Sequence, residues 1–171
     1  PDNIYAWKIQ PHSTAMDIQH EHYKMYSGMK LLNVQVDVID ICQSIDEYKI
    51  ILLPCPLLLT KAQLAKLENF MANGGTVICG YRAGLKDQDN AIYFNEPNPL
   101  LNLARLRSYY IESLGSGVTV DLHDEIYHYT ASVWRDILEP LDADKVETVF
   151  SYSDEFSNYA AVTKTKIGHG E

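Results

Sequence analysis

The sequence predicts an α/β fold in which a mainly parallel sheet is flanked by helices and is followed by a β-rich C-terminal part. Strand-like and helix-like segments alternate over residues 1–80, an order typical of parallel sheets with right-handed crossovers. Residues 100–171 instead hold several short, tyrosine-rich segments of strand-like composition. The length of 171 residues and the hydrophobic content of 46% indicate one globular domain with a substantial core.

The first 80 residues are expected to fold in the order strand, helix, strand, strand, helix, strand. Apolar residues at helical spacing predict the first helix, and alternation with period two predicts the strand that follows it. The expected strands cover residues 3–7, 34–39, 48–53 and 76–80, and the first helix covers residues 16–33.

The second helix has the clearest sequence signals. Thr60 is expected to cap its N-terminus, and Gln63 is expected to complete a capping box. The sequence Asn73-Gly74-Gly75 predicts the end of this helix, because glycine tolerates the positive φ that a helix C-terminus often needs. The buried stripe is expected to consist of apolar side chains at helical spacing: Leu64, Leu67, Phe70 and Met71.

Beyond residue 80, the chain is expected to form a polar loop over residues 81–99 and a β-rich remainder over residues 100–171. Periodicity leaves open whether the later strands extend the first sheet or form a second one. A short helix is expected at residues 100–106, and strands are expected at residues 108–111, 118–122, 126–134, 146–152 and 159–167.

The composition excludes several classes of partner. Fourteen basic and 23 acidic residues give a net charge of −9, which disfavours binding to nucleic acid or to an anionic membrane surface. The longest apolar run, residues 50–59, contains two prolines and is shorter than the roughly 20 residues of a membrane span. Three cysteines in apolar settings are expected to be reduced thiols, which favours a cytoplasmic location.

Short motifs in the middle of the chain come in a specific order. The most specific element is the helix end at residues 73–76, followed by a strand and then by Tyr-Arg-x-Gly-x-x-Asp at residues 81–87. The sequence resembles the trimerisation domain of family-42 β-galactosidases, the middle domain that follows their catalytic barrel. Further matching positions are Asp37-Val38, residues 47–50, Pro54, Leu57, Leu58, residues 70–77, Glu112 and the turn at residues 168–170.

This resemblance implies a class I glutamine-amidotransferase-like (flavodoxin-like) sandwich and a non-catalytic oligomerisation role. Enzymes of the family are retaining glycosidases that hydrolyse terminal β-D-galactosides with two glutamates of a (β/α)₈ barrel. Such a barrel needs about 250 residues, so residues 1–171 are expected to be a single domain excised from a longer chain. The implied partners are further copies of the chain, in a homotrimer, and the catalytic barrel of the parent. No cofactor is implied.

The strongest candidates for functional residues are a group of polar side chains in the expected loop: Tyr81, Arg82, Asp87 and Asp89. The spacing of Arg82 and Asp87 allows a bidentate ion pair that would order the loop. Because this loop leaves the C-terminal edge of the predicted sheet, a contact with a neighbouring domain or subunit is expected there. The sequence thus predicts loop-ordering or interface residues and no catalytic residue within the chain.

The sequence is also compatible with two other classes of function. An amidotransferase- or hydrolase-like enzyme would use Cys79 as its nucleophile, since such folds can carry a reactive cysteine where a strand ends. A domain that binds a small ligand or a carbohydrate would use the sheet edge near Pro54 and Tyr81.

No metal site is expected. On a helix, His20 and His22 point about 200° apart and cannot hold one ion. Residues 123–125, His-Asp-Glu, are interpreted as a solvated turn at a strand end.

Overall fold

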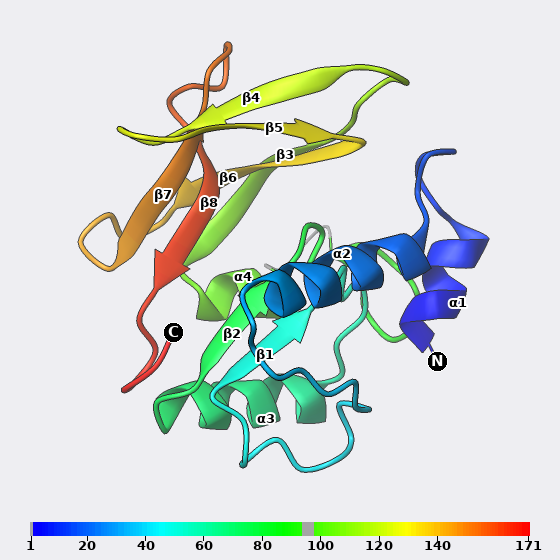
Figure 1. The fold of residues 1–171 in the computed structure, drawn as a ribbon, viewed down its shortest axis with the longest axis vertical. Coiled ribbons are helices and arrows are strands. Elements are labelled where there is room, and N and C mark those ends of the chain that lie inside the picture. The colour runs from blue at the N-terminus through cyan, green and yellow to red at the C-terminus, as the bar shows by residue number, and fades with distance from the viewer. Residues whose placement is uncertain (1, 94–97) are drawn as a thin grey trace.

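The computed structural model describes residues 2–93 and 98–171, so residues 94–97 of the expected loop lie outside the described residues (Figure 1). The first half contains α1 (Asp2–Ile9), α2 (Ile18–Leu31), β1 (Ile50–Leu53), α3 (Lys61–Ala72) and β2 (Thr76–Cys79). The second half contains α4 (Pro99–Leu103), β3 (Leu106–Ser113), β4 (Thr119–His123), β5 (His128–Ser132), β6 (Trp134–Pro140), β7 (Val146–Tyr152) and β8 (Ala160–Thr165).

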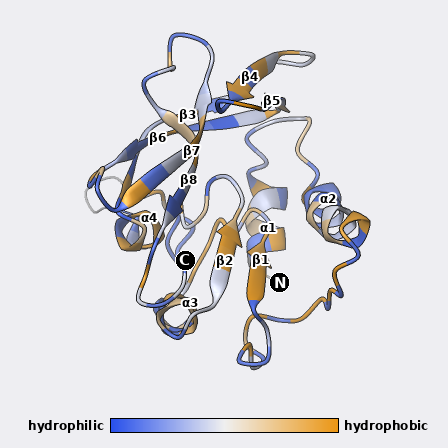
Figure 2. Ribbon diagram, turned by 60° about the vertical axis from the view of Figure 1, so that its left-hand side comes forward, coloured by the Kyte–Doolittle hydropathy of each residue, from blue (hydrophilic) through white to orange (hydrophobic). Residues whose placement is uncertain are grey.

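The strands form two separate sheets. β1 and β2 pair in parallel, and this pair lies between α2 and α3 in both ribbon views (Figures 1 and 2). The other strands form a six-stranded antiparallel sheet in the order β3-β6-β8-β7-β4-β5. The β-rich half is therefore a sheet of its own and does not extend the parallel pair.

The predicted fold class is wrong. Among the described residues, the parallel arrangement is limited to two strands and an antiparallel sheet dominates, which does not agree with a class I glutamine-amidotransferase-like (flavodoxin-like) sandwich. A doubly wound sheet needs further parallel strands beside β1 and β2. The segments expected to supply them, residues 3–7 and 34–39, do not form strands.

Tertiary contacts explain why residues 3–7 lie in a helix and do not form the expected strand. The apolar residues from Ile4 to Trp7 have strand-like composition, yet they lie within α1. Asn3 pairs with the backbone of Leu58 through both polar atoms of its amide, at 2.9 and 2.7 Å. Trp7 is buried, and its Nε1 donates to the carbonyl of Cys55 at 3.0 Å. These contacts outweigh the local preference.

Helix α3 confirms its sequence signals. Thr60 Oγ1 accepts from the backbone of Gln63, and the Gln63 side chain accepts from the backbone of Thr60, which makes both halves of the capping box. Asn73 is the C-cap, and Gly74 has a φ of +101°. The helix covers the β1–β2 pair with a buried stripe made of Leu67, Phe70 and Met71, whereas Leu64, the fourth expected member, is only half-buried.

The later strands agree with the sequence in part. β7 has the expected bounds, and β3, β4 and β8 overlap their expected segments. The segment expected at 126–134 instead holds β5 and the first residue of β6, with a break at Val133. Most of β6 was not predicted, although this strand lies beside both β3 and β8.

Among the described residues, two buried clusters form the core. One lies beneath α3, and the other gathers around Trp7 and Trp134. Figure 2 shows β1 as a continuously hydrophobic strand, in keeping with its place between helices. In the described part of the chain, no helix is both long enough and apolar enough to cross a bilayer.

Candidate functional site around Arg82

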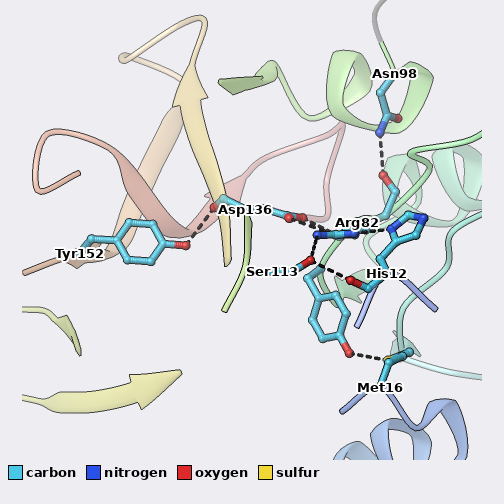
Figure 3. Close-up of polar contacts among 9 residues, drawn as sticks. His12, Met16, Arg82, Asn98, Ser113, Asp136 and Tyr152 are labelled. Atoms are coloured by element: carbon cyan, nitrogen blue, oxygen red, sulfur yellow. Dashed lines mark hydrogen bonds and ion pairs between the residues drawn. The ribbon is translucent and has the colours of Figure 1, made fainter. Parts of the chain in front are cut away.

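Arg82 lies at the centre of the junction between the two sheets (Figure 3). It lies three residues after the end of β2 and is only 5% exposed. Its guanidinium carbon is 3.9 Å from the centroid of the Trp134 ring, a cation–π contact. Nη2 donates to Ser113 Oγ at 3.3 Å, and Nη1 contacts Nδ1 of His12. The Arg82 side chain, which follows β2, thus contacts three other elements: the segment between α1 and α2, strand β3 and strand β6.

Asp136 supplies the negative charge of this site. Its Oδ2 accepts from the backbone N–H of Arg82 at 2.5 Å, and its Oδ1 is 3.9 Å from Arg82 Nε. Burial raises the pKa of this carboxyl, while the hydrogen bond and the charge of Arg82 oppose the rise. Tyr152 Oη donates to the backbone carbonyl of Asp136 at 2.9 Å, which fixes β6 at this point.

Successive side chains of β6 point to opposite faces of the strand, and this places the contacts of Arg82 on one face and those of Arg135 on the other. Trp134 and Asp136 contact Arg82, whereas Arg135 contacts Glu112 and Asp154, as strand geometry requires for neighbouring residues. Glu112 therefore holds a buried arginine in place.

Strained backbone surrounds the Arg82 site. Four non-glycine residues there have a positive φ: Cys55 (46°), Arg82 (54°), His12 (57°) and Val133 (73°). Positive φ is costly for a β-branched residue such as valine. Strain of this kind persists only where surrounding contacts impose it, and it gathers at functional or switching sites.

Lys86 is a further buried charge of this region, and its sequence context did not predict its burial. It is 1% exposed, and its Nζ donates to the side-chain oxygens of Gln10 and of Asn90, the latter at 3.1 Å. Burial, together with the charge of Arg82, lowers the pKa of the lysine. A lysine next to an aspartate normally indicates a solvated turn. The one sequence feature that could have drawn attention to Lys86 is its place inside the Tyr-Arg-x-Gly-x-x-Asp motif, at a variable position.

The polar residues predicted in the loop do not gather into one cluster. Arg82 pairs with Asp136 and not with Asp87. Asp87 Oδ1 instead accepts from the backbone N–H groups of Asp89 and Ala91, both at 2.9 Å, which shapes the turn. Asp89 is exposed.

Tyr81 belongs to the aromatic core and not to the solvated loop. Its ring lies 5.8 Å from Trp134 and 6.2 Å from Trp7, centroid to centroid. Its hydroxyl donates to Met16 Sδ at 3.3 Å, and burial raises its pKa.

The geometry weighs against both alternative functions. Burial raises the pKa of the Cys79 thiol to about 12, and among the described residues no hydrogen bond links this thiol to a base. The edge near Pro54 and Tyr81 is filled by protein, since Trp7 packs there and bonds the carbonyl of Cys55. In the described part of the chain, no three histidine, cysteine or acidic side chains come together as metal ligands would.

Comparison with known families matches residues 1–171 to the model of the β-galactosidase trimerisation domain. The chain belongs to this family. The β-galactosidase BgaA of Clostridium cellulovorans is 28% identical over 171 residues, which cover 99% of this chain and 26% of BgaA. The β-galactosidase Bga of Halorubrum lacusprofundi is 28% identical over 142 residues, which cover 82% of this chain and 19% of that protein.

Solved β-galactosidase structures share the fold of this trimerisation domain. The enzyme from Bacillus circulans sp. alkalophilus superposes with a TM-score of 0.84 at 20% identity, over 92% of this chain and 24% of that one. The enzyme from the haloarchaeon Halorubrum lacusprofundi gives a TM-score of 0.83 at 24% identity, over 99% of this chain and 27% of that one. The chain spans about a quarter of the length of these relatives.

Proposed function

We propose that this trimerisation domain is non-catalytic and that a longer β-galactosidase uses it to assemble as a homotrimer. The observation that carries the proposal is the family match along the whole chain. The relatives are named β-galactosidases and are about four times as long, which leaves room for a catalytic barrel in the parent. Hydrolysis of terminal β-D-galactosides, by a retaining mechanism, would take place in that barrel.

The proposed assembly needs two different surfaces on each protomer, because closure with three-fold symmetry requires a heterologous interface. We assign the loop after β2 to one of them, with Tyr81, Arg82 and Asp87 ordering the loop and Asp89 available for contact. The burial of Arg82 and the exposure of Asp89 support this division of roles. Exposed tyrosines of the second sheet and of its β4–β5 turn are candidates for the other surface: Tyr109, Tyr110, Tyr127 and Tyr129.

We further propose that residues 1–171 act as one domain of the parent, because Arg82 ties the two sheets together through buried contacts. A cytoplasmic location is consistent with the three free cysteines, Cys42, Cys55 and Cys79.

Light scattering of the full-length parent tests the assembly. We expect three chains per particle, and we expect Asp89→Lys to shift the equilibrium toward monomer on dilution. Glu68→Lys, the same charge reversal on an exposed position of α3, is the matched control and should leave the trimer intact. If the Asp89 variant stays trimeric at all dilutions, the loop after β2 does not contribute to the interface.

Catalysis is tested separately on the 171-residue chain. Purified chain should not turn over a chromogenic galactoside above a mock preparation, whereas the parent should. Turnover by the chain alone would contradict the non-catalytic role.

A further inference from the structure

His12 connects the segment between α1 and α2 to the buried Arg82. The contact is made by Nη1 of Arg82 and Nδ1 of His12 (Figure 3). A guanidinium carries only donors and keeps its charge throughout the accessible pH range. Nδ1 must therefore accept the hydrogen bond, so the imidazole is neutral and carries its proton on Nε2.

The surroundings of His12 disfavour a second positive charge. Its ring contacts the edges of two indoles, at 5.8 Å from Trp7 and 6.2 Å from Trp134, centroid to centroid. Arg82 and Lys86 are the charged groups that face it, and among the described residues no carboxylate pairs with its ring. The nearby Asp136 is engaged by Arg82 itself.

We propose that His12 is a proton-operated latch: its neutral ring holds residues 10–17 against Arg82 and β3, and protonation releases this segment. A protonated ring would point an N–H donor at the N–H groups of Arg82. The hydrogen bond is then lost, and two positive charges are left in contact.

The other anchors of this region determine how far the release extends. α1 is held to the segment that follows β1 by the Asn3 amide on Leu58 and by the Trp7 indole on the Cys55 carbonyl, and none of these groups titrates near neutral pH. Among the described residues, the segment 10–17 keeps three hydrogen bonds to residues 81–113 besides the His12–Arg82 contact, one of them from the Tyr81 hydroxyl to Met16 Sδ at 3.3 Å. The carbonyl of His12 accepts from Ser113 Oγ at 3.1 Å, and Gln10 accepts from Lys86. Because α1 keeps its own anchors, the release should be confined to residues 10–17.

Two further features fit a release at this point. A surface hollow lined by residues 12–15 and 113–116 brings solvent to the latch. His12 is held at a φ of +57°, a strained conformation that release would relax.

The pH window follows from the direction of the pKa shift. Burial and the charges of Arg82 and Lys86 lower the pKa of His12 from its ordinary value near 6.5. The folded state therefore binds this proton less tightly than the unfolded state does. The stabilisation by the latch is complete above about pH 6.5 and is lost as the pH falls through the lowered pKa.

Hydrogen–deuterium exchange of the full chain between pH 7.5 and 5 tests the latch, with rates corrected for the intrinsic pH dependence of exchange. Peptides that cover residues 10–17 should show a several-fold rise in corrected exchange on acidification, while peptides of α3 stay protected. His12→Gln keeps an acceptor for Arg82 but cannot titrate, so its exchange in this segment should not change with pH. His20→Gln, an exposed histidine of α2, is the matched control and should behave as the wild type.

Two results would overturn the proposal: no rise in the wild type down to pH 5, or an equal rise in His12→Gln. Protection of α3 at pH 7.5 reports whether each variant is folded. If His12→Gln fails that check, His12→Asn, which also offers a non-titrating acceptor, takes its place in the same comparison.

Discussion

The guanidinium of Arg82 lies over the face of the Trp134 indole, with 3.9 Å between its central carbon and the ring centroid. The two residues belong to different layers, since Arg82 follows β2 of the parallel pair and Trp134 begins β6 of the antiparallel sheet. Stacking on an indole and pairing with Asp136 offset part of the cost of burying the charge. The junction between the sheets thus depends on a charged side chain as well as on apolar packing.

Replacing Arg82 should be costly for this reason. We expect Arg82→Ala to lower the free energy of unfolding by about 3 kcal/mol, because Asp136 would remain buried without its partner. Arg107→Ala removes an arginine that pairs with Glu139 on the surface, and should cost less than about 1 kcal/mol. Urea denaturation measures both variants. Equal effects would mean that the buried pair contributes no more than the exposed one.

The cap of α3 offers a second test. Thr60→Ala should lower the free energy of unfolding by about 1 kcal/mol, because it removes the acceptor of the Gln63 N–H. Ser27→Ala on α2 removes a hydroxyl that donates to a carbonyl within an exposed helix turn, and should change stability by less than about 0.5 kcal/mol. Thermal denaturation compares the two, and an unchanged melting temperature for Thr60→Ala would rule out a contribution from this cap.

Local signals were predictable from the sequence, and α3 shows why. Its capping box and its C-cap involve residues a few positions apart, so their pattern can be read directly from the chain. Residues 34–39 show the limit of that approach. They alternate as a strand would, but in the part of the chain that the structure describes no strand pairs with them, and a strand needs hydrogen bonds from a partner.

The Arg82 site was predictable only in part, for the same physical reason. The sequence indicated that Arg82 would be paired and would order its loop, and a carboxylate five residues away was the natural candidate. The carboxylate that Arg82 contacts is Asp136, on a strand of the other sheet. The position of His12 against Arg82 also depends on the packing of α1. Contacts so distant along the chain leave no local pattern.

Gly170 provides a third test, at the C-terminal turn. A Cβ atom there would overlap the carbonyl oxygen of Gly75, which immediately precedes β2, and would lie 2.5 Å from that of Met71 in the last turn of α3. We expect Gly170→Ala to lower the free energy of unfolding by about 2 kcal/mol, since backbone on both sides would have to move. Gly28→Ala within α2 meets no atom within 4 Å and should stabilise the helix by about 0.5–1 kcal/mol. Urea denaturation should show changes of opposite sign in the free energy of unfolding of the two variants. No change in Gly170→Ala would mean that the turn adapts at little cost.

The thiols provide the last test, and it bears on the enzyme alternative. Cys42 is exposed, whereas Cys55 is buried and Cys79 is partly so, and burial raises the pKa of the latter two to about 11 and about 12. Only a thiolate reacts readily, so at pH 8 the raised pKa keeps the Cys79 sulfur almost entirely in the unreactive thiol form.

Iodoacetamide at pH 8 should therefore label the native chain at Cys42 alone, as judged by mass spectrometry of peptides. Hydrogen bonding with the Asp40 carboxylate also raises the pKa of Cys42, so it is the exposure of this thiol that makes it the reactive one. Cys42→Ser is the matched variant and should take up no label until the chain is unfolded in urea, when Cys55 and Cys79 should both react. A nucleophile would behave in the opposite way, because activation requires a lowered pKa and access to solvent. Fast labelling of Cys79 in the folded Cys42→Ser chain would restore the amidotransferase- or hydrolase-like reading, and its absence leaves that cysteine as a packing residue at the end of β2.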